Sequence, residues 1–156
     1  MSTSLGNKLP DRLVKFLENE NLKRKNSAIF LVTSDPEGYP HIALLSPYQV
    51  VIKDSRTLFI AVHKGTRSQK FLEHEGKATM IVQLQPAVEY IKFQIARADD
   101  WGSEKMDSLY VATPTEILED YSDKAPFTSE LEFDEKKIVD AYREGFHKMR
   151  EYILKH

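Results

Sequence analysis

Three cations lie close together in the segment HKGTRSQKFLE, which directly follows the apolar run TLFIAV. They are Lys64, Arg67 and Lys70. The apolar run is typical of a buried strand, and the polar residues after it are typical of a helix start. Because a helix N-terminus already presents unpaired N–H donors and a partial positive charge, added cations are unfavourable there unless an anion neutralises them. The segment therefore predicts an anion-binding site.

The residue types in this segment suit a phosphate group. Gly65 allows a sharp turn off the strand, and the hydroxyl of Thr66 can cap the helix. Arg67 offers a planar fork of N–H donors, Lys70 lies one helical turn later on the same face, and Ser68 adds a hydroxyl. The G-x-x-x-x-G-K-[S/T] spacing of a P-loop is absent, so hydrolysis of nucleoside triphosphates has no support. The alternative is a capped helix whose cations point into water.

Composition excludes several other classes of function. A chain of 156 residues fits a single domain, 1–156, and 41% hydrophobic with 29% charged residues is typical of a globular protein in water. A net charge of −2 gives no support for a nucleic-acid partner or a membrane surface. The absence of cysteine excludes disulfides, thiolate metal sites and a cysteine nucleophile. Since no stretch approaches the ~20 apolar residues that cross a bilayer, and no signal peptide is recognisable, we expect a cytoplasmic protein.

The histidines do not predict a catalytic or metal site. None of the five forms an i, i+4 pair on a predicted helix, and no H-E-x-x-H motif occurs. No G-x-S-x-G motif supports a hydrolase. His63 adjoins the proposed phosphate segment at a strand end, and we interpret it as structural or as an indirect support of that site. The sequence identifies no general acid or base.

Alternating and continuous apolar runs predict a mainly antiparallel sheet that closes into a barrel over about 27–120. The turn at Asp35–Gly38 indicates a hairpin, and Pro114 in the last strand suits an edge or a bulge. The strand at 57–62 is apolar on both faces and should lie inside the sheet. Six strands are predicted, at 28–33, from 41 to about 52, 57–62, from 78 to about 85, 90–95 and 108–121.

Three helices are expected around this sheet. An N-terminal helix over about 10–20 should pack Leu13, Phe16 and Leu17, and a short helix over about 68–75 should end at Gly76. A C-terminal helix over about 134–155 is amphipathic, with cations near its end. Its expected apolar face comprises Ile138, Tyr142, Gly145, Met149 and Tyr152.

The order of these segments resembles the FMN-binding split-barrel proteins related to pyridoxamine 5′-phosphate oxidase. Asp35, Gly38 and Pro40 match the D-x-x-G-x-P turn between the first two strands of that family. The segment that holds the FMN phosphate in the family is matched by Thr66, Arg67, Ser68 and Lys70. The resemblance covers roughly residues 27–100, and it rests on the order and spacing of the motifs together.

The resemblance implies a six-stranded antiparallel Greek-key split barrel with peripheral helices and a C-terminal helix. It also implies bound FMN and a homodimer, because the cofactor of the family lies between two subunits. The flavin ring lies against main chain at positions that correspond to Ser46, Pro47, Tyr48 and Val62, where plain strand packing is the alternative. Trp101 is a candidate for contact with the partner chain, although a single Trp also suits a core.

The chain departs from the true pyridoxamine phosphate oxidases in two places. Residues 43–48 lack their basic pair, and the charged helix over 134–155 replaces their Trp, Arg and His constellation for the substrate. The leading hypothesis is therefore an FMN-dependent oxidoreductase that acts on an unidentified small molecule, with the redox step belonging to the flavin. One alternative is a non-catalytic module that binds a deazaflavin, haem or another phosphate-bearing ligand. Another is a structural or interaction protein.

Overall fold

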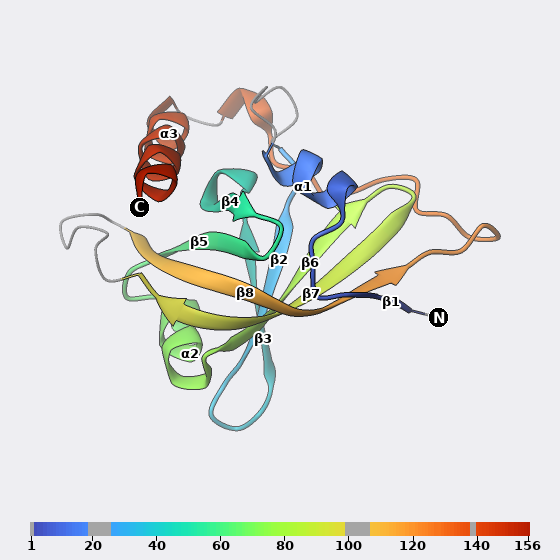
Figure 1. Cartoon of the computed structure of the whole chain (residues 1–156), viewed down its shortest axis with the longest axis horizontal. Coiled ribbons are helices and arrows are strands. Elements are labelled where there is room, and N and C mark those ends of the chain that lie inside the picture. Colours follow the sequence, from blue (N-terminus) through green and yellow to red (C-terminus); the bar gives the residue numbers. More distant parts are fainter. Residues whose placement is uncertain (1, 19–25, 99–106, 138–139) are drawn as a thin grey trace.

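Eight strands form one sheet in the described part of the chain, and three helices lie around it (Figure 1). The computed structural model describes residues 2–18, 26–98, 107–137 and 140–156. The strands are β1 (Thr3–Gly6), β2 (Ile29–Ser34), β3 (Pro40–Leu45), β4 (Val50–Asp54), β5 (Thr57–His63), β6 (Lys77–Leu84), β7 (Ala87–Arg97) and β8 (Asp107–Asp120). The helices are α1 (Asp11–Glu18), α2 (Arg67–Glu75) and α3 (Asp140–Lys155), with 3₁₀ turns at Pro47–Gln49 and Glu135–Lys137. No helix within the described ranges is both long and apolar enough to span a bilayer.

The strands are ordered β3-β2-β6-β7-β8-β5-β4, and β1 pairs with β8 beside this path. Every pairing between described strands is antiparallel, which confirms the predicted sheet type. As predicted, β5 lies inside the sheet, between β4 and β8. The end strands β3 and β4 are not paired with each other, so the expected closure into a barrel is wrong. The sheet is an open one.

The two strands beyond the predicted six have separate origins. The run from His41 to about residue 52 is two strands, because Pro47 begins a 3₁₀ turn between β3 and β4. The side chain of Gln49 holds that turn by accepting from the N–H of Ser46 at 3.0 Å and donating to the carbonyl of Ala61 at 3.1 Å. The other added strand is β1, whose partner β8 is far away in the sequence, so no local pattern indicates it.

Two predicted local features are confirmed. In the hairpin, Asp35 Oδ1 accepts from the N–H of Tyr39 at 2.8 Å, and Gly38 has a φ of +90°, which favours glycine. Pro114 lies at a bulge between β7 and β8, where the register skips Thr115. The bulge explains how an inner strand accommodates a proline that cannot donate to the ladder.

The main core lies inside the curved sheet and is closed by α1. Leu13 and Leu17 of α1 are buried in it, and Phe16 is partly buried against it, as predicted. A second cluster joins α3 to β4, β5 and β8, with Phe146 and Met149 of the helix both buried.

The buried face of α3 agrees only in part with the predicted one, since Met149 is buried and Tyr152 is partly buried as predicted. It comprises Phe146, Met149 and Ile153, whereas Tyr142 is 56% exposed and Gly145 is also exposed. The 3.6-residue period holds, but the face is rotated, because the aromatic ring of residue 146 packs edge-to-face on Tyr48. The predicted face also included Ile138, which lies outside the described residues.

Candidate functional site

Residues 64–70, here the 64–70 turn, lead from β5 into α2 with the predicted cap. Gly65 has a φ of +79°, a left-handed conformation that favours glycine. Thr66 is the N-cap: its hydroxyl accepts from the N–H of Gln69 at 3.3 Å and donates to the carbonyl of His63 at 2.8 Å. The side chain of Gln69 returns to the turn, where its Oε1 accepts from the N–H of Gly65 at 2.6 Å. These bonds fix the start of α2 relative to the end of β5.

Several donors at the start of α2 remain available for an anion. The backbone N–H groups of Arg67 and Ser68 donate to no described residue. The side chains of Arg67 and Lys70 are exposed and form no ion pair with any residue that the structure describes. The Ser68 hydroxyl is buried and lies 3.1 Å from Nε2 of His41, so the two groups share a hydrogen bond. The 64–70 turn thus combines the cations of Arg67 and Lys70 with two N–H groups that donate to no described residue.

A polar network holds α2 on β8 beneath this turn. Gln69 Nε2 donates to Ser108 Oγ at 3.0 Å and to Glu73 Oε1 at 3.3 Å. The same carboxylate accepts from the Tyr110 hydroxyl at 2.8 Å and from Arg97 at 3.2 Å. Burial, followed by the hydrogen bond and charge of Glu73, raises the pKa of Tyr110 from 10.0 to about 12. Tyr110 therefore stays a neutral donor over the physiological pH range.

Near the start of β4, a cavity of about 330 Å³ adjoins the end of β5; we call it the Tyr48 cavity. Two predicted ring-contact residues, Ser46 and Tyr48, line it, and so does His63. Since the Thr66 hydroxyl binds the carbonyl of His63, the cavity is connected to the 64–70 turn through a single residue. The complete lining is Leu44, Ser46, Tyr48, Gln49, His63, Phe133, Asp134, Lys137 and Tyr142.

The segment before α3 brings Phe133 and its neighbours into the lining. Its backbone bonds to the residues before β2: the Ala28 N–H donates to Leu131 O, and the Phe133 N–H donates to Asn26 O, both at 2.7 Å. Sequence reasoning missed this wall, because the segment is polar and its partners are distant in the chain. In the sequence, only Tyr142 could have indicated this wall. It is an aromatic residue of α3 that does not belong to the buried face of that helix.

The other predicted ring-contact residues do not line the cavity. Pro47 is buried in the turn before β4, and the side chain of Val62 lies in the main core at 3% exposure. Any contact of Val62 with a ligand would therefore involve its main chain. Trp101 lies outside the described residues.

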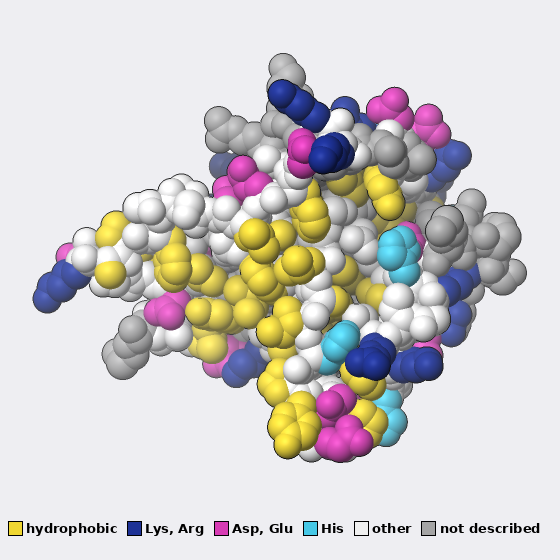
Figure 2. All heavy atoms as spheres, turned by 180° about the vertical axis from the view of Figure 1, so that it is seen from behind, with side chains coloured by type: hydrophobic (Ala, Val, Ile, Leu, Met, Phe, Trp, Pro, Cys, Tyr) yellow, Lys and Arg dark blue, Asp and Glu magenta, His cyan; other side chains and the backbone are white. Residues whose placement is uncertain are grey.

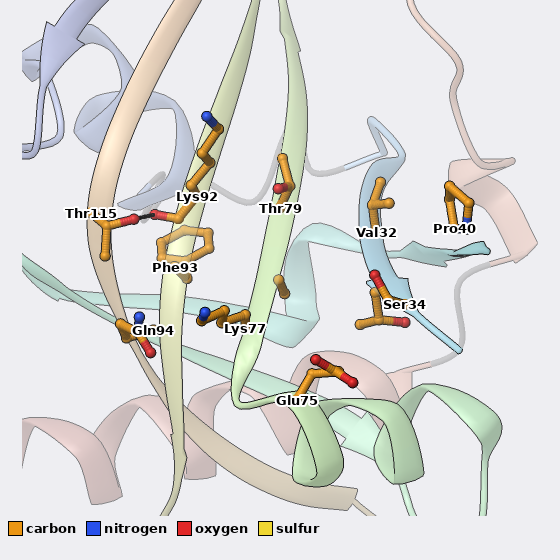
Figure 3. A pocket seen from close by; sticks show the side chains of 12 residues that line it. Val32, Ser34, Pro40, Glu75, Lys77, Thr79, Lys92, Phe93, Gln94 and Thr115 are labelled. Atoms are coloured by element: carbon orange, nitrogen blue, oxygen red, sulfur yellow. Dashed lines mark hydrogen bonds between the residues drawn. The ribbon is translucent and has the colours of Figure 1, made fainter. Parts of the chain in front are cut away.

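A second hollow, of about 470 Å³, lies among β2, β6 and β7 (Figure 3). Lys77 and Lys92 lie beside it, but Lys92 forms an ion pair with Glu116 at 2.7 Å, and none of the predicted site residues lines the hollow. We therefore place the candidate site at the Tyr48 cavity and the 64–70 turn.

An apolar surface extends over the outer face of the sheet on the β2–β3 side. In the register of the sheet, Leu44 of edge strand β3 is opposite Phe30 of β2. Phe30 is in turn opposite Ile81 of β6, and Ile81 is opposite Tyr90 of β7. These four side chains therefore form one row across four strands. In the next row, Ile42 of β3 is 59% exposed. Figure 2 shows hydrophobic side chains gathered across the middle of this face. We call it the outer apolar face.

Comparison with known sequences gives limited information. No model of a known protein family matches the chain. A protein of Bacillus subtilis (strain 168), named Uncharacterized protein YclD, is 29% identical over 91 residues, which are 58% of this chain and 59% of that relative. The match thus spans less than two thirds of the relative.

Comparison with solved structures is more informative about the fold. A Lactobacillus delbrueckii protein, named a "putative pyridoxamine 5′-phosphate oxidase", matches 73% of this chain and 97% of its own, with a TM-score of 0.58 and 13% identity. HupZ of Group A Streptococcus matches 71% and 98%, with a TM-score of 0.57 and 10% identity. An FMN-binding protein of Syntrophomonas wolfei matches 72% and 89%, with a TM-score of 0.53 and 15% identity. The chain therefore has the split-barrel fold of the proteins that resemble pyridoxamine 5′-phosphate oxidase, a fold that flavin-binding proteins use.

Proposed function

We propose that this protein binds FMN and is an FMN-dependent oxidoreductase that acts on a small molecule. The phosphate lies on the 64–70 turn, held by Arg67, Lys70 and the backbone N–H groups of Arg67 and Ser68, while the Thr66 hydroxyl, which donates to the carbonyl of His63, fixes the turn. The flavin ring extends toward Ser46 and the Tyr48 cavity. Bound FMN supplies the electron transfer, and the chain binds and orients the ring.

One observation supports this proposal above the others: two cations and two N–H groups without a described partner follow directly on His63, which lines a cavity of suitable size. Arg67 and Lys70 meet no carboxylate among the described residues, although like charge at a helix start is unfavourable. A phosphate dianion removes that cost. The cavity of about 330 Å³ is within the range of small-molecule sites, which is roughly 300–1,000 Å³. An FMN-binding protein with the same fold adds support.

We also propose that two copies pair through the outer apolar face. Ile42 and Leu44 are about half exposed on edge strand β3, and a row of apolar side chains continues inward from them. Large exposed apolar patches mark interaction sites more often than free surface. The same strand carries His41, which contacts Ser68, so a partner on this face lies near the cofactor site.

The proposal is tested by cofactor titration of the purified protein. Flavin absorption that denaturation releases, or quenching of FMN fluorescence that saturates at one FMN per chain, is the expected result. A deazaflavin and haem are titrated in parallel. Tight binding of one of these in place of FMN would favour the non-catalytic module, and no binding of FMN at any concentration tested would reject the flavin site.

A further inference from the structure

A histidine and an aspartate form a pair at the edge of the Tyr48 cavity. His63 ends β5 and Asp107 begins β8, and the two residues are level with each other across the antiparallel strands. Nδ1 of the imidazole contacts Oδ1 of the carboxylate, and that oxygen is fully buried. A carboxylate on Nδ1 favours the tautomer in which Nδ1 carries the proton. Nε2 is then the nitrogen that can exchange a proton.

The imidazole of His63 is accessible from the cavity. Its side chain is 49% exposed, and it lines the Tyr48 cavity with the aromatic rings of Tyr48, Phe133 and Tyr142. The other charged side chains in the lining are Asp134 and Lys137, which lie 3.9 Å apart and are exposed. Among the lining residues, His63 is thus the group whose ring nitrogen can donate a proton inside the cavity.

The start of β8 positions both this pair and the 64–70 turn. Asp107 contacts His63, which precedes the turn, and the next residue, Ser108, accepts a hydrogen bond from Gln69, which lies within it. Two consecutive residues of β8 therefore hold the turn and the residue before it. The position of the imidazole is fixed relative to the proposed phosphate site.

We propose that His63 is the proton donor of this site and that Asp107 is its positioning residue; this rests on the proposed FMN site. The aromatic walls indicate a small, planar, conjugated carbonyl compound as the electron acceptor, and p-benzoquinone is the probe. The quinone gains a hydride from reduced FMN and one proton from Nε2 of His63. Both C=O π bonds are lost as the ring becomes aromatic, one O–H bond forms at each oxygen, the reduced FMN anion is thereby oxidised to FMN, and water returns the proton to His63.

The first test uses the protein without cofactor. Nitrogen-15 NMR of the imidazoles at pH 9 should show His63 with its proton on Nδ1, and Asp107→Asn should abolish that preference. His74→Gln, a change at an exposed histidine of α2, serves as the control for assignment and folding. A proton on Nε2 of His63 in the wild type would overturn the proposal, whether or not the protein binds FMN.

The second test measures oxidation of bound, chemically reduced FMN by p-benzoquinone in a stopped-flow instrument. His63→Gln should slow this step by about 10²–10⁴-fold, with the FMN dissociation constant changed less than threefold, and His74→Gln should match the wild type. Free imidazole should partly restore the rate of His63→Ala. An unchanged rate in His63→Gln would overturn the proton-donor role of His63 without affecting the proposed FMN site. Failure of the wild type to bind FMN would reject the proposed function. In that case the tautomer of His63 measured by NMR still shows whether Asp107 positions the imidazole.

Discussion

At the residue scale, the candidate site depends on where the chain leaves charges unpaired. Arg97 and Lys92 each meet a carboxylate, whereas Arg67 and Lys70 meet none in the described structure. Surface ion pairs are worth little, so their absence is a weak signal alone. It becomes informative here because the two cations lie at a helix start where the N–H groups of Arg67 and Ser68 also donate to no described residue.

The Tyr110 hydroxyl gives a prediction about pH and stability. Its pKa is about 12 in the folded protein against 10.0 ordinarily, so the folded state binds the proton more tightly. The stabilisation is complete below pH 10 and is lost as the pH rises toward 12. We therefore expect the free energy of unfolding, measured in urea, to fall over this window in the wild type and to fall less in Tyr110→Phe.

Lysines also titrate in that range and contribute to the slope in both proteins. The informative quantity is therefore the difference between the wild type and Tyr110→Phe in how the free energy of unfolding changes with pH. Tyr90→Phe is the matched control, because its pKa is also raised, by burial and by Asp120, but its side chain is only half-buried. Equal slopes for wild type and Tyr110→Phe between pH 10 and 12 would contradict the raised pKa of Tyr110 in the folded protein.

At the element scale, local patterns predicted most of the fold. The D-x-x-G-x-P hairpin, the Thr66 cap and the end of α2 at Gly76 all depend on neighbours in the sequence, and all are confirmed. Features that depend on distant partners were missed: β1, the open sheet edge, the Phe133 wall and the pairing of His63 with Asp107. The sequence thus predicted the conformation of the 64–70 turn but only part of the lining of the Tyr48 cavity.

Alanine substitutions at two glycines of different conformation test where α2 ends and whether α3 is helical at residue 145. Gly76 ends α2 with a φ of +62° and donates to Leu72 O at 2.9 Å, whereas Gly145 lies within α3 with open space around it. Gly76→Ala should destabilise the protein by about 1 kcal/mol, because the left-handed conformation strains alanine. Gly145→Ala should stabilise it by about 0.5–1 kcal/mol. Urea unfolding curves give the change in the free energy of unfolding for each variant. A change of the same sign in both variants would refute the end of α2 at Gly76.

At the scale of the whole molecule, helices cover part of the sheet and leave the outer apolar face exposed (Figures 1 and 2). The helix α3 packs on β4, β5 and β8, and α1 closes the interior. On the β2–β3 side, β3 is an edge strand with exposed apolar side chains, a kind of surface that tends to associate.

We therefore expect the protein to be a dimer that a charge on this face disrupts. Leu44→Glu and Ile42→Glu should each shift the sedimentation coefficient from dimer to monomer, because an unpaired carboxylate is costly in an apolar interface. Leu154→Glu, at a similarly exposed leucine of α3, should leave the dimer intact. A wild-type monomer at all concentrations, or a dimer unaffected by both changes on β3, would exclude pairing through this face.

If the 64–70 turn binds the phosphate of a flavin, the protein should distinguish FMN from riboflavin, which lacks that phosphate. Titration calorimetry of the wild type should show FMN binding at least about 100-fold tighter, since each charge-assisted contact contributes ~1.5–3 kcal/mol and 1.4 kcal/mol is tenfold. Arg67→Ala combined with Lys70→Ala should remove most of that preference and leave riboflavin affinity unchanged. Lys53→Ala with Arg56→Ala, two exposed cations near the end of β4 and in the turn to β5, is the matched control and should keep the preference. Equal affinity of the wild type for FMN and riboflavin, or a preference that survives the loss of Arg67 and Lys70, would contradict the account.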